Sequence, residues 1–121
     1  MASYSDLYNN YDVTKHALVL AFDDCEHMRI NTKYEQTALT AIHHLQSPKN
    51  CQIILHGQTL PPTAVMDTFS EYSSEPSKVN KAIMVSEENW VTSSMHPSLL
   101  LKPAKLKVYF LKQNQILLKV V

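Results

Sequence analysis

The side chains best suited to chemistry in this sequence follow two apolar runs. The segment Asp23-Asp24-Cys25-Glu26-His27 comes directly after the first run, and His56 comes directly after the second. Carboxylates and imidazoles bind divalent metal ions, and a bound metal ion lowers the pKa of water enough to permit hydrolysis. A metal-dependent hydrolase would use the following candidate residues: Asp23, Asp24, Glu26, His27 and His56.

The same acidic segment has a simpler interpretation. Polar residues after a buried strand form a solvated loop, and acids there complement the dipole of a following helix. The spacing of Asp23, Asp24 and His56 matches no named metal motif. We therefore favour the solvated loop and expect neither a metal ion nor a cofactor.

A second group of candidate residues is basic and lies near the C-terminus. Residues 102–121 contain five lysines and no acid, whereas residues 1–101 contain six basic residues and all eleven acids. The alternating pattern from Leu106 predicts a hairpin with one apolar and one basic face. The predicted interaction face consists of Lys105, Lys107, Tyr109 and Lys119. In one interpretation this face binds a nucleic acid, with the lysines on the phosphates and the tyrosine ring stacked on a base. In the other, the lysines only protect an outer strand from edge-to-edge aggregation.

Glycine and arginine are scarce, which excludes several functional classes. Gly57 is the only glycine in the chain, where average usage of about 7% would give roughly eight. Phosphate-binding loops and the nucleophile elbow need several glycines, so Walker A, Rossmann and G-x-S-x-G motifs are absent. Arg29 is the only arginine. Sequence-specific reading of DNA bases, which relies on arginine, is therefore not expected.

The two cysteines predict no zinc site and no disulfide. Cys25 and Cys51 lie 26 positions apart, without a C-x-x-C motif, which excludes zinc ribbons and thioredoxin-type motifs. Parallel strands would place the two cysteines at opposite ends of the sheet, too far apart to be bridged. The neighbouring carboxylates oppose formation of a Cys25 thiolate. Both cysteines are therefore expected to be reduced and structural.

The elements that must position these residues begin with a strand and a helix. Ala17–Phe22 is a continuous apolar run, as in a strand buried on both faces. Thr32 and Glu35 form a capping-box pattern, and apolar residues then recur at helical spacing until Ser47-Pro48. Ile30 extends the apolar stripe toward the N-terminus. The sequence thus predicts an amphipathic helix that packs against the first strand.

The rest of the chain completes an α/β domain. Cys51–Leu55 predicts a second strand parallel to the first, and Pro61-Pro62 predicts the start of a second helix. Lys81–Val85 predicts a third strand, followed by a short helical turn near Trp90. The expected fold is a single α/β domain over residues 1–121, with two or three helices. Its mixed sheet has about five strands, in a β-α-β-α-β core and a C-terminal β-hairpin. Residues 1–14 would be an arm or a short helix.

Three short segments resemble the receiver domain of response regulators. The run ending in Asp23-Asp24 is similar to that family's first strand and acidic pair, Met84-Val85-Ser86 to its fourth strand, and Leu101-Lys102-Pro103 to its lysine-proline turn. The resemblance implies Mg²⁺ at the acidic pair, a switch hydroxyl at Ser86 and a phosphate-sensing Lys102. However, His56 stands in place of the phosphoacceptor aspartate, a strand-helix unit is missing, and the chain ends in a hairpin. The chain is therefore not assigned to this family.

The sequence favours a non-enzymatic accessory protein, such as an adaptor, a complex subunit or an inhibitor. No motif joins a serine to a base or to an oxyanion hole, and His43 and His44 do not point to one place on their helix. The formal net charge is zero, which favours association with a protein partner or with a second copy. The first residues do not form a secretory signal and no apolar run is long enough to span a bilayer, so we expect a cytoplasmic protein without membrane contact.

Overall fold

The computed structural model of the protein describes residues 16–44, 51–73, 81–83, 88–96, 105–113 and 115–119. The elements are β1 (His16–Asp23), the 3₁₀-helix η1 (Cys25–Arg29), α2 (Thr32–His44), β2 (Cys51–His56), α3 (Thr63–Ser73), β3 (Lys81–Ile83), α4 (Trp90–Ser94), β4 (Lys105–Lys112) and β5 (Gln115–Lys119). The α/β class is confirmed. The predicted arm at residues 1–14 lies outside the described residues.

The strands form one sheet in the order β3-β2-β1-β4-β5. The first four are parallel to their neighbours, and β5 is antiparallel to β4. The predicted parallel pairing of the first two strands is confirmed, with Leu20 opposite Ile53. The sequence did not predict the order. After β3, the chain returns to the other side of β1, so that a topological switch point lies between β1 and β4.

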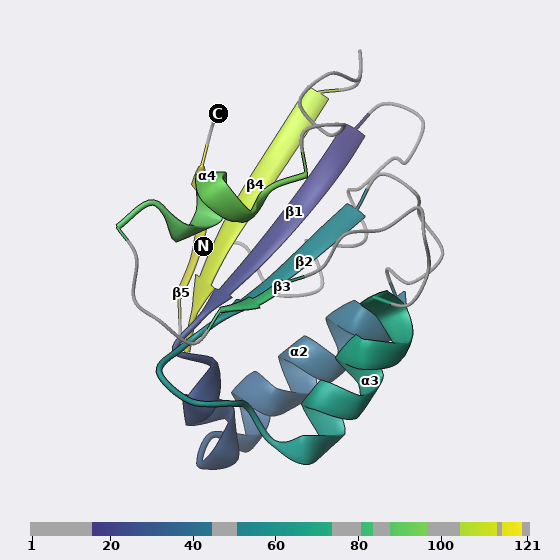
Figure 1. Ribbon diagram of the computed structural model, residues 1–121, viewed down its shortest axis with the longest axis vertical. Coiled ribbons are helices and arrows are strands. Elements are labelled where there is room, and N and C mark those ends of the chain that lie inside the picture. The colour runs from purple at the N-terminus through teal and green to yellow at the C-terminus, as the bar shows by residue number, and fades with distance from the viewer. Residues whose placement is uncertain are drawn as a thin grey trace.

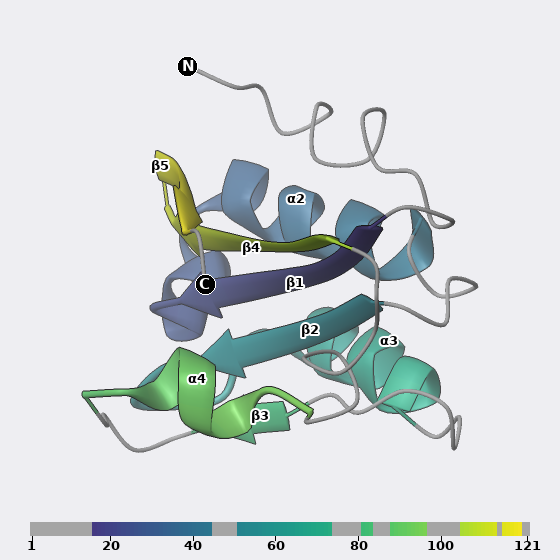
Figure 2. The ribbon, with the colours of Figure 1, turned by 90° about the horizontal axis from the view of Figure 1, so that it is seen from above.

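Helices cover both faces of the sheet, as Figures 1 and 2 show. The helices α2 and α3 lie on one face, and α4 lies on the other. Right-handed crossovers explain this division. The connections from β1 to β2 and from β2 to β3 run in one direction along the sheet, whereas the connection from β3 to β4 runs in the opposite direction, so its helix lies on the opposite face. The carboxyl ends of the four parallel strands consequently meet at one edge of the sheet.

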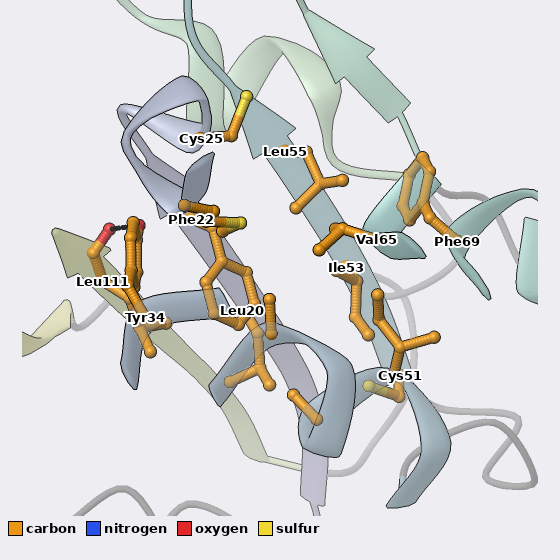
Figure 3. Packing of buried hydrophobic residues seen from close by; sticks show 14 of the residues in the cluster. Leu20, Phe22, Cys25, Tyr34, Cys51, Ile53, Leu55, Val65, Phe69 and Leu111 are labelled. Carbon is orange, nitrogen blue, oxygen red and sulfur yellow. Dashed lines mark hydrogen bonds between the residues drawn. The ribbon is translucent and has the colours of Figure 1, made fainter. Parts of the chain in front are cut away.

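The larger core lies between the sheet and the two long helices. Phe22 and Leu20 of β1 point toward it, together with Ile53 and Leu55 of β2 (Figure 3). Residues at alternating positions along β1 face opposite sides. Since Ala17, Val19 and Ala21 are also fully buried, β1 is a central strand buried on both faces, as predicted.

The smaller core lies beneath α4. Trp90 and Val91 of α4 pack there with Met95, which follows the helix, and with Val108 of β4. The buried Gln52 side chain fastens this layer to the sheet. Its Nε2 donates a hydrogen bond to the Ser94 carbonyl at 2.7 Å, and its Oε1 accepts one from the backbone N–H of His96 at 2.9 Å.

The start of α2 differs from the prediction by one residue. Asn31, and not Thr32, is the capping residue, because its Oδ1 accepts a hydrogen bond from the N–H of Tyr34 at 3.1 Å. The expectation that Ile30 continues the buried stripe is wrong. Its side chain is 86% exposed, because η1 turns the chain before α2 begins.

The predicted single basic face at the C-terminus is also wrong. In the β4–β5 pairing, Lys119 lies opposite Val108, and Leu118 lies opposite Tyr109. Paired residues share a face of the sheet. Lys119 therefore occupies a position on the α4 face, whereas Lys107 and Tyr109 occupy positions on the α2 face.

Candidate functional site

The carboxyl edge of the parallel strands brings together two of the predicted site residues. Asp23 ends β1 and His56 ends β2, and the Asp23 Oδ1 lies 2.7 Å from the His56 Nδ1. This convergence follows from the parallel pairing, which puts both strand ends at one edge. Because His56 is only 6% exposed, the pair lies largely inside the protein.

The imidazole of His56 is fixed on two sides. Its Nδ1 donates a hydrogen bond to the Asp23 carboxylate, which determines the tautomer of the neutral ring. Its face stacks on the indole of Trp90, with ring centroids 4.2 Å apart and planes 9° apart. Trp90 in turn contacts Phe110 of β4, at a centroid distance of 5.6 Å. The ring therefore has one orientation, held from β1 and from α4.

Asp23 is itself held in place by neighbouring groups. Its Oδ1 accepts a second hydrogen bond, from the backbone N–H of Asp24 at 2.8 Å. The buried Tyr34 hydroxyl contacts the backbone carbonyl oxygens of Asp23 at 2.5 Å and of Leu111 at 3.1 Å; the second contact is drawn in Figure 3. Tyr34 thus joins the ends of β1 and β4 across the switch point.

A cavity of about 180 Å³ opens beside the Asp23–His56 pair. Its walls come from the ends of β1 and β2 and from the segment leading into α4: Asp23, Asp24, His56, Gly57, Gln58, Glu88 and Trp90. In liquid water one molecule occupies about 30 Å³, so the cavity has room for roughly six non-hydrogen atoms. Cavities for drug-sized ligands have about 300–1,000 Å³. The cavity is therefore smaller than one that encloses a drug-sized ligand, and a small polar group fits.

The cavity is acidic. Asp23, Asp24 and Glu88 bring three carboxylates to its walls. The Asp24 Oδ2 lies 3.6 Å from the Lys112 Nζ, and the Lys112 side chain is 51% exposed. Even with Lys112 and a protonated His56 counted, one negative charge remains. The electrostatics of the cavity favour a cation.

Asp24 adopts an unusual backbone conformation at the entrance to η1. Its φ is 51°, in the left-handed region that few residues other than glycine adopt. Aspartate tolerates this region better than most residues. The turn lets the chain reverse directly after β1, so that the Asp24 side chain lines the cavity and η1 packs beside the strand end.

The two other metal candidates do not line the cavity. The Glu26 Oε2 accepts a hydrogen bond from the backbone N–H of Gln58 at 3.0 Å, and the His27 Nδ1 contacts the Gln113 Nε2. Both side chains fasten η1 to neighbouring segments. In the part of the chain that the structure describes, no three His, Cys, Asp or Glu side chains are grouped to hold a metal ion.

The single glycine lies at this edge because two segments approach closely there. A Cβ at Gly57 would lie 2.1 Å from the Glu26 Oε2 and 2.8 Å from the Cys25 Sγ. Any side chain at this position would push η1 away from the end of β2. Gly57, which lines the cavity, therefore permits the close approach of η1 to the end of β2.

Cys25 is not a nucleophile in this environment. Burial and, to a smaller extent, the negative charges of Glu26, Asp23 and Asp24 together raise the pKa of its thiol to about 12. Its Sγ lies 3.5 Å from the Thr59 carbonyl oxygen. Cys25 and Cys51 are both buried, and neither forms a disulfide, as predicted.

The predicted lysine face does not contribute to the lining of the cavity. Tyr109 packs against the larger core, and Lys107 is partly buried on the same face of β4. Lys105 begins β4 opposite His16, and Lys119 ends β5. A tyrosine ring packed in this way presents less surface for stacking on a base.

Four cavity residues were not predicted from the sequence: Gly57, Gln58, Glu88 and Trp90. Gly57 and Gln58 directly follow His56, so the rule that ligands bind beyond strand ends would have found them. Glu88 and Trp90 belong to a segment whose position depends on the crossover to β4. No pattern in the sequence places that crossover beside β2.

Comparison with known proteins found no relative. No protein-family model matches the chain, and neither the curated proteins nor the solved structures contain a match. Separately, within the residues that the structure describes, none of the helices has the length and apolarity of a membrane span.

Proposed function

We propose that this protein is a non-enzymatic accessory protein that recognises a partner protein through a basic side chain. The partner would insert a lysine or arginine into the acidic cavity at the carboxyl edge of the sheet. The observation that carries the proposal is this small cavity, walled by Asp23, Asp24 and Glu88.

The size of the cavity supports a side chain as the ligand. The aliphatic stem and ammonium group of lysine, or the guanidinium end of arginine, contain about as many non-hydrogen atoms as the roughly six that the cavity accommodates. Such a fragment binds weakly by itself. A dissociation constant of about 1 mM corresponds to a binding free energy of about 4 kcal/mol. This is less than the upper limit for a fragment of roughly six non-hydrogen atoms, which is about 1.5 kcal/mol for each atom.

The charges of the cavity support a cation. Glu88 is exposed, and Asp24 already pairs with an ammonium group, that of Lys112. An exposed pair of this kind contributes only about 0–1 kcal/mol. A partner's lysine can therefore displace Lys112 at little cost. Basic groups are favoured over neutral ones of the same shape.

Fluorescence of the only tryptophan provides a direct test, because Trp90 lines the cavity. Nα-acetyl-lysine amide should change the emission in a saturable way, with a dissociation constant of about 1 mM. Nα-acetyl-norleucine amide is the neutral control of similar shape. The variants Asp24→Asn and Glu88→Gln should each weaken lysine binding several-fold, whereas Asp67→Asn, on the exposed surface of α3, should leave it unchanged.

Two results would contradict the proposal. The first is the absence of saturable binding by the lysine and arginine amides. The second is equal binding by norleucine amide, because the charge of the cavity would then play no part.

The Asp23–His56 hydrogen bond favours hydrolysis as a second candidate function. A carboxylate that accepts from Nδ1–H orients an imidazole for general base catalysis, as in hydrolases with a Ser-His-Asp triad. Cys25 is excluded as the nucleophile by its raised pKa, so His56 would have to activate a water molecule. The measurement is p-nitrophenyl acetate hydrolysis with and without Mg²⁺, Mn²⁺ or Zn²⁺. Rates equal for His56→Gln, Asp23→Asn and the exposed control His43→Gln would eliminate this candidate.

A further inference from the structure

Two aliphatic side chains are exposed on segments that begin at the cavity wall. Ile30 is 86% exposed and Leu60 is 47% exposed, and they are the exposed large hydrophobic residues of the described chain. The exposure of a single aliphatic residue is ordinary. Here, however, each of the two residues follows a residue that lines the cavity: Ile30 follows Asp24 by six positions, and Leu60 follows Gln58 by two.

The two segments run side by side and are cross-linked along their length. At the cavity end, the Glu26 carboxylate accepts a hydrogen bond from the N–H of Gln58 at 3.0 Å. At the far end, Arg29 donates to two carbonyl oxygens, from Nε to Leu60 at 3.0 Å and from Nη2 to Pro61 at 3.1 Å. The guanidinium group therefore holds the segment that carries Leu60 beside the end of η1, where Ile30 follows.

We propose that Ile30 and Leu60 form an apolar subsite that binds an aliphatic side chain of the same partner segment. This inference rests on the proposed function, because the basic residue of the segment would occupy the cavity. Charge complementarity to the carboxylates of the cavity requires a basic residue in the occupant, and the exposed Ile30 and Leu60 side chains favour an aliphatic one. The occupant is therefore a peptide segment that carries both. A strongly acidic or purely polar segment would not satisfy both subsites.

The distance between the cavity wall and Leu60 determines how far apart the basic and aliphatic residues of the partner segment must be. Leu60 follows Gln58 of the cavity wall by two positions, so their Cα atoms are at most about 7 Å apart. In an extended peptide, side chains two positions apart lie on the same face at about this separation, and adjacent side chains point to opposite faces. The partner segment should therefore carry its basic and aliphatic residues at positions i and i+2, in either chain direction.

Four blocked tripeptides test the inference by Trp90 fluorescence: Lys-Ala-Leu, Leu-Ala-Lys, Lys-Leu-Ala and Lys-Ala-Ala. At least one of the first two should bind about fivefold more tightly than Lys-Ala-Ala, the effect of partly burying one leucine. Lys-Leu-Ala, with adjacent residues, should show little gain. The variants Ile30→Ser and Leu60→Ser should remove the gain, and Ile30→Leu should retain it. Because both side chains are exposed, these variants should fold normally.

The outcomes separate this inference from the proposed function. If Lys-Ala-Ala binds but leucine adds nothing at either spacing, the apolar subsite is refuted and the basic-side-chain site stands. A gain that persists in both serine variants would also refute the subsite, because leucine would then bind elsewhere. If no basic peptide binds, the proposed function itself fails and the inference fails with it.

Discussion

The two faces of the sheet are stabilised in different ways. On one face, α2 and α3, of 13 and 11 residues, bury fifteen of the described residues in one cluster. On the other face, α4 has five residues and the corresponding cluster has eight. The smaller layer depends on the His56–Trp90 stack and on the hydrogen bonds of Gln52. Apolar burial stabilises the first face, whereas specific polar contacts position the second and shape the cavity.

The largest expected effect is on the face covered by α2 and α3. Phe22 is fully buried there, so Phe22→Ala should lower the free energy of unfolding by about 3–5 kcal/mol. Val91→Ala, in the smaller core, removes two methyl groups and should cost about 1.5 kcal/mol. Urea denaturation measures both. Equal losses would show that the two faces contribute alike and would contradict the comparison.

The next effect concerns the attachment of α4. The variant Gln52→Ala leaves the Ser94 carbonyl and the His96 N–H without their partner, which should cost about 2 kcal/mol. If α4 loosens, Trp90 should emit at longer wavelength while the far-UV circular dichroism of the domain persists. Gln36→Ala, on the exposed surface of α2, is the matched control. An unchanged Trp90 spectrum in Gln52→Ala would mean that apolar packing alone holds this layer.

A smaller, pH-dependent effect should come from Cys25. Burial and the neighbouring carboxylates raise the pKa of its thiol from 9.0 to about 12, so the folded protein retains this proton when the unfolded chain has lost it. The stability that the thiol contributes is complete below pH 9.0 and is lost as the pH rises toward about 12. Between these values, wild-type stability should fall more steeply with pH than that of Cys25→Ala, as chemical denaturation will measure. Parallel curves would contradict burial of the thiol.

The smallest effect should come from Lys112. Because its pair with Asp24 is exposed, Lys112→Ala should change the free energy of unfolding by less than about 0.5 kcal/mol. The same change removes a competing cation, so the cavity should bind lysine amide about two- to threefold more tightly, as measured by Trp90 fluorescence. Weaker binding by this variant would show that Lys112 belongs to the site and does not compete for it.

Much of the α2 and α3 face could be predicted from the sequence. The apolar run from Ala17 to Phe22 gave the central strand, and residues at helical spacing gave α2 after the capping signal. The prediction erred where short-range signals compete. Asn31 and Thr32 are both good capping residues, and only the turn after η1 selects Asn31 and exposes Ile30.

The candidate site was predicted only in part. Parallel strands put Asp23 and His56 at one edge, and the structure places their side chains 2.7 Å apart. The sequence also grouped Glu26 and His27 with them, but these side chains turn to other partners because η1 coils directly after Asp24. Proximity in sequence does not fix the direction of a side chain in a tight helical turn.

Local patterns in the sequence determined the strands, the helices, the inert cysteines and the shared edge of Asp23 and His56. These features depend on residues within one or two elements, where apolar periodicity and capping dominate the free energy. Tertiary structure alone decided that β4 pairs with β1, that α4 covers the opposite face, and that Trp90 stacks on His56. Such pairings join residues more than 30 positions apart, and they are selected by the packing of the whole domain because no local pattern distinguishes one neighbour from another.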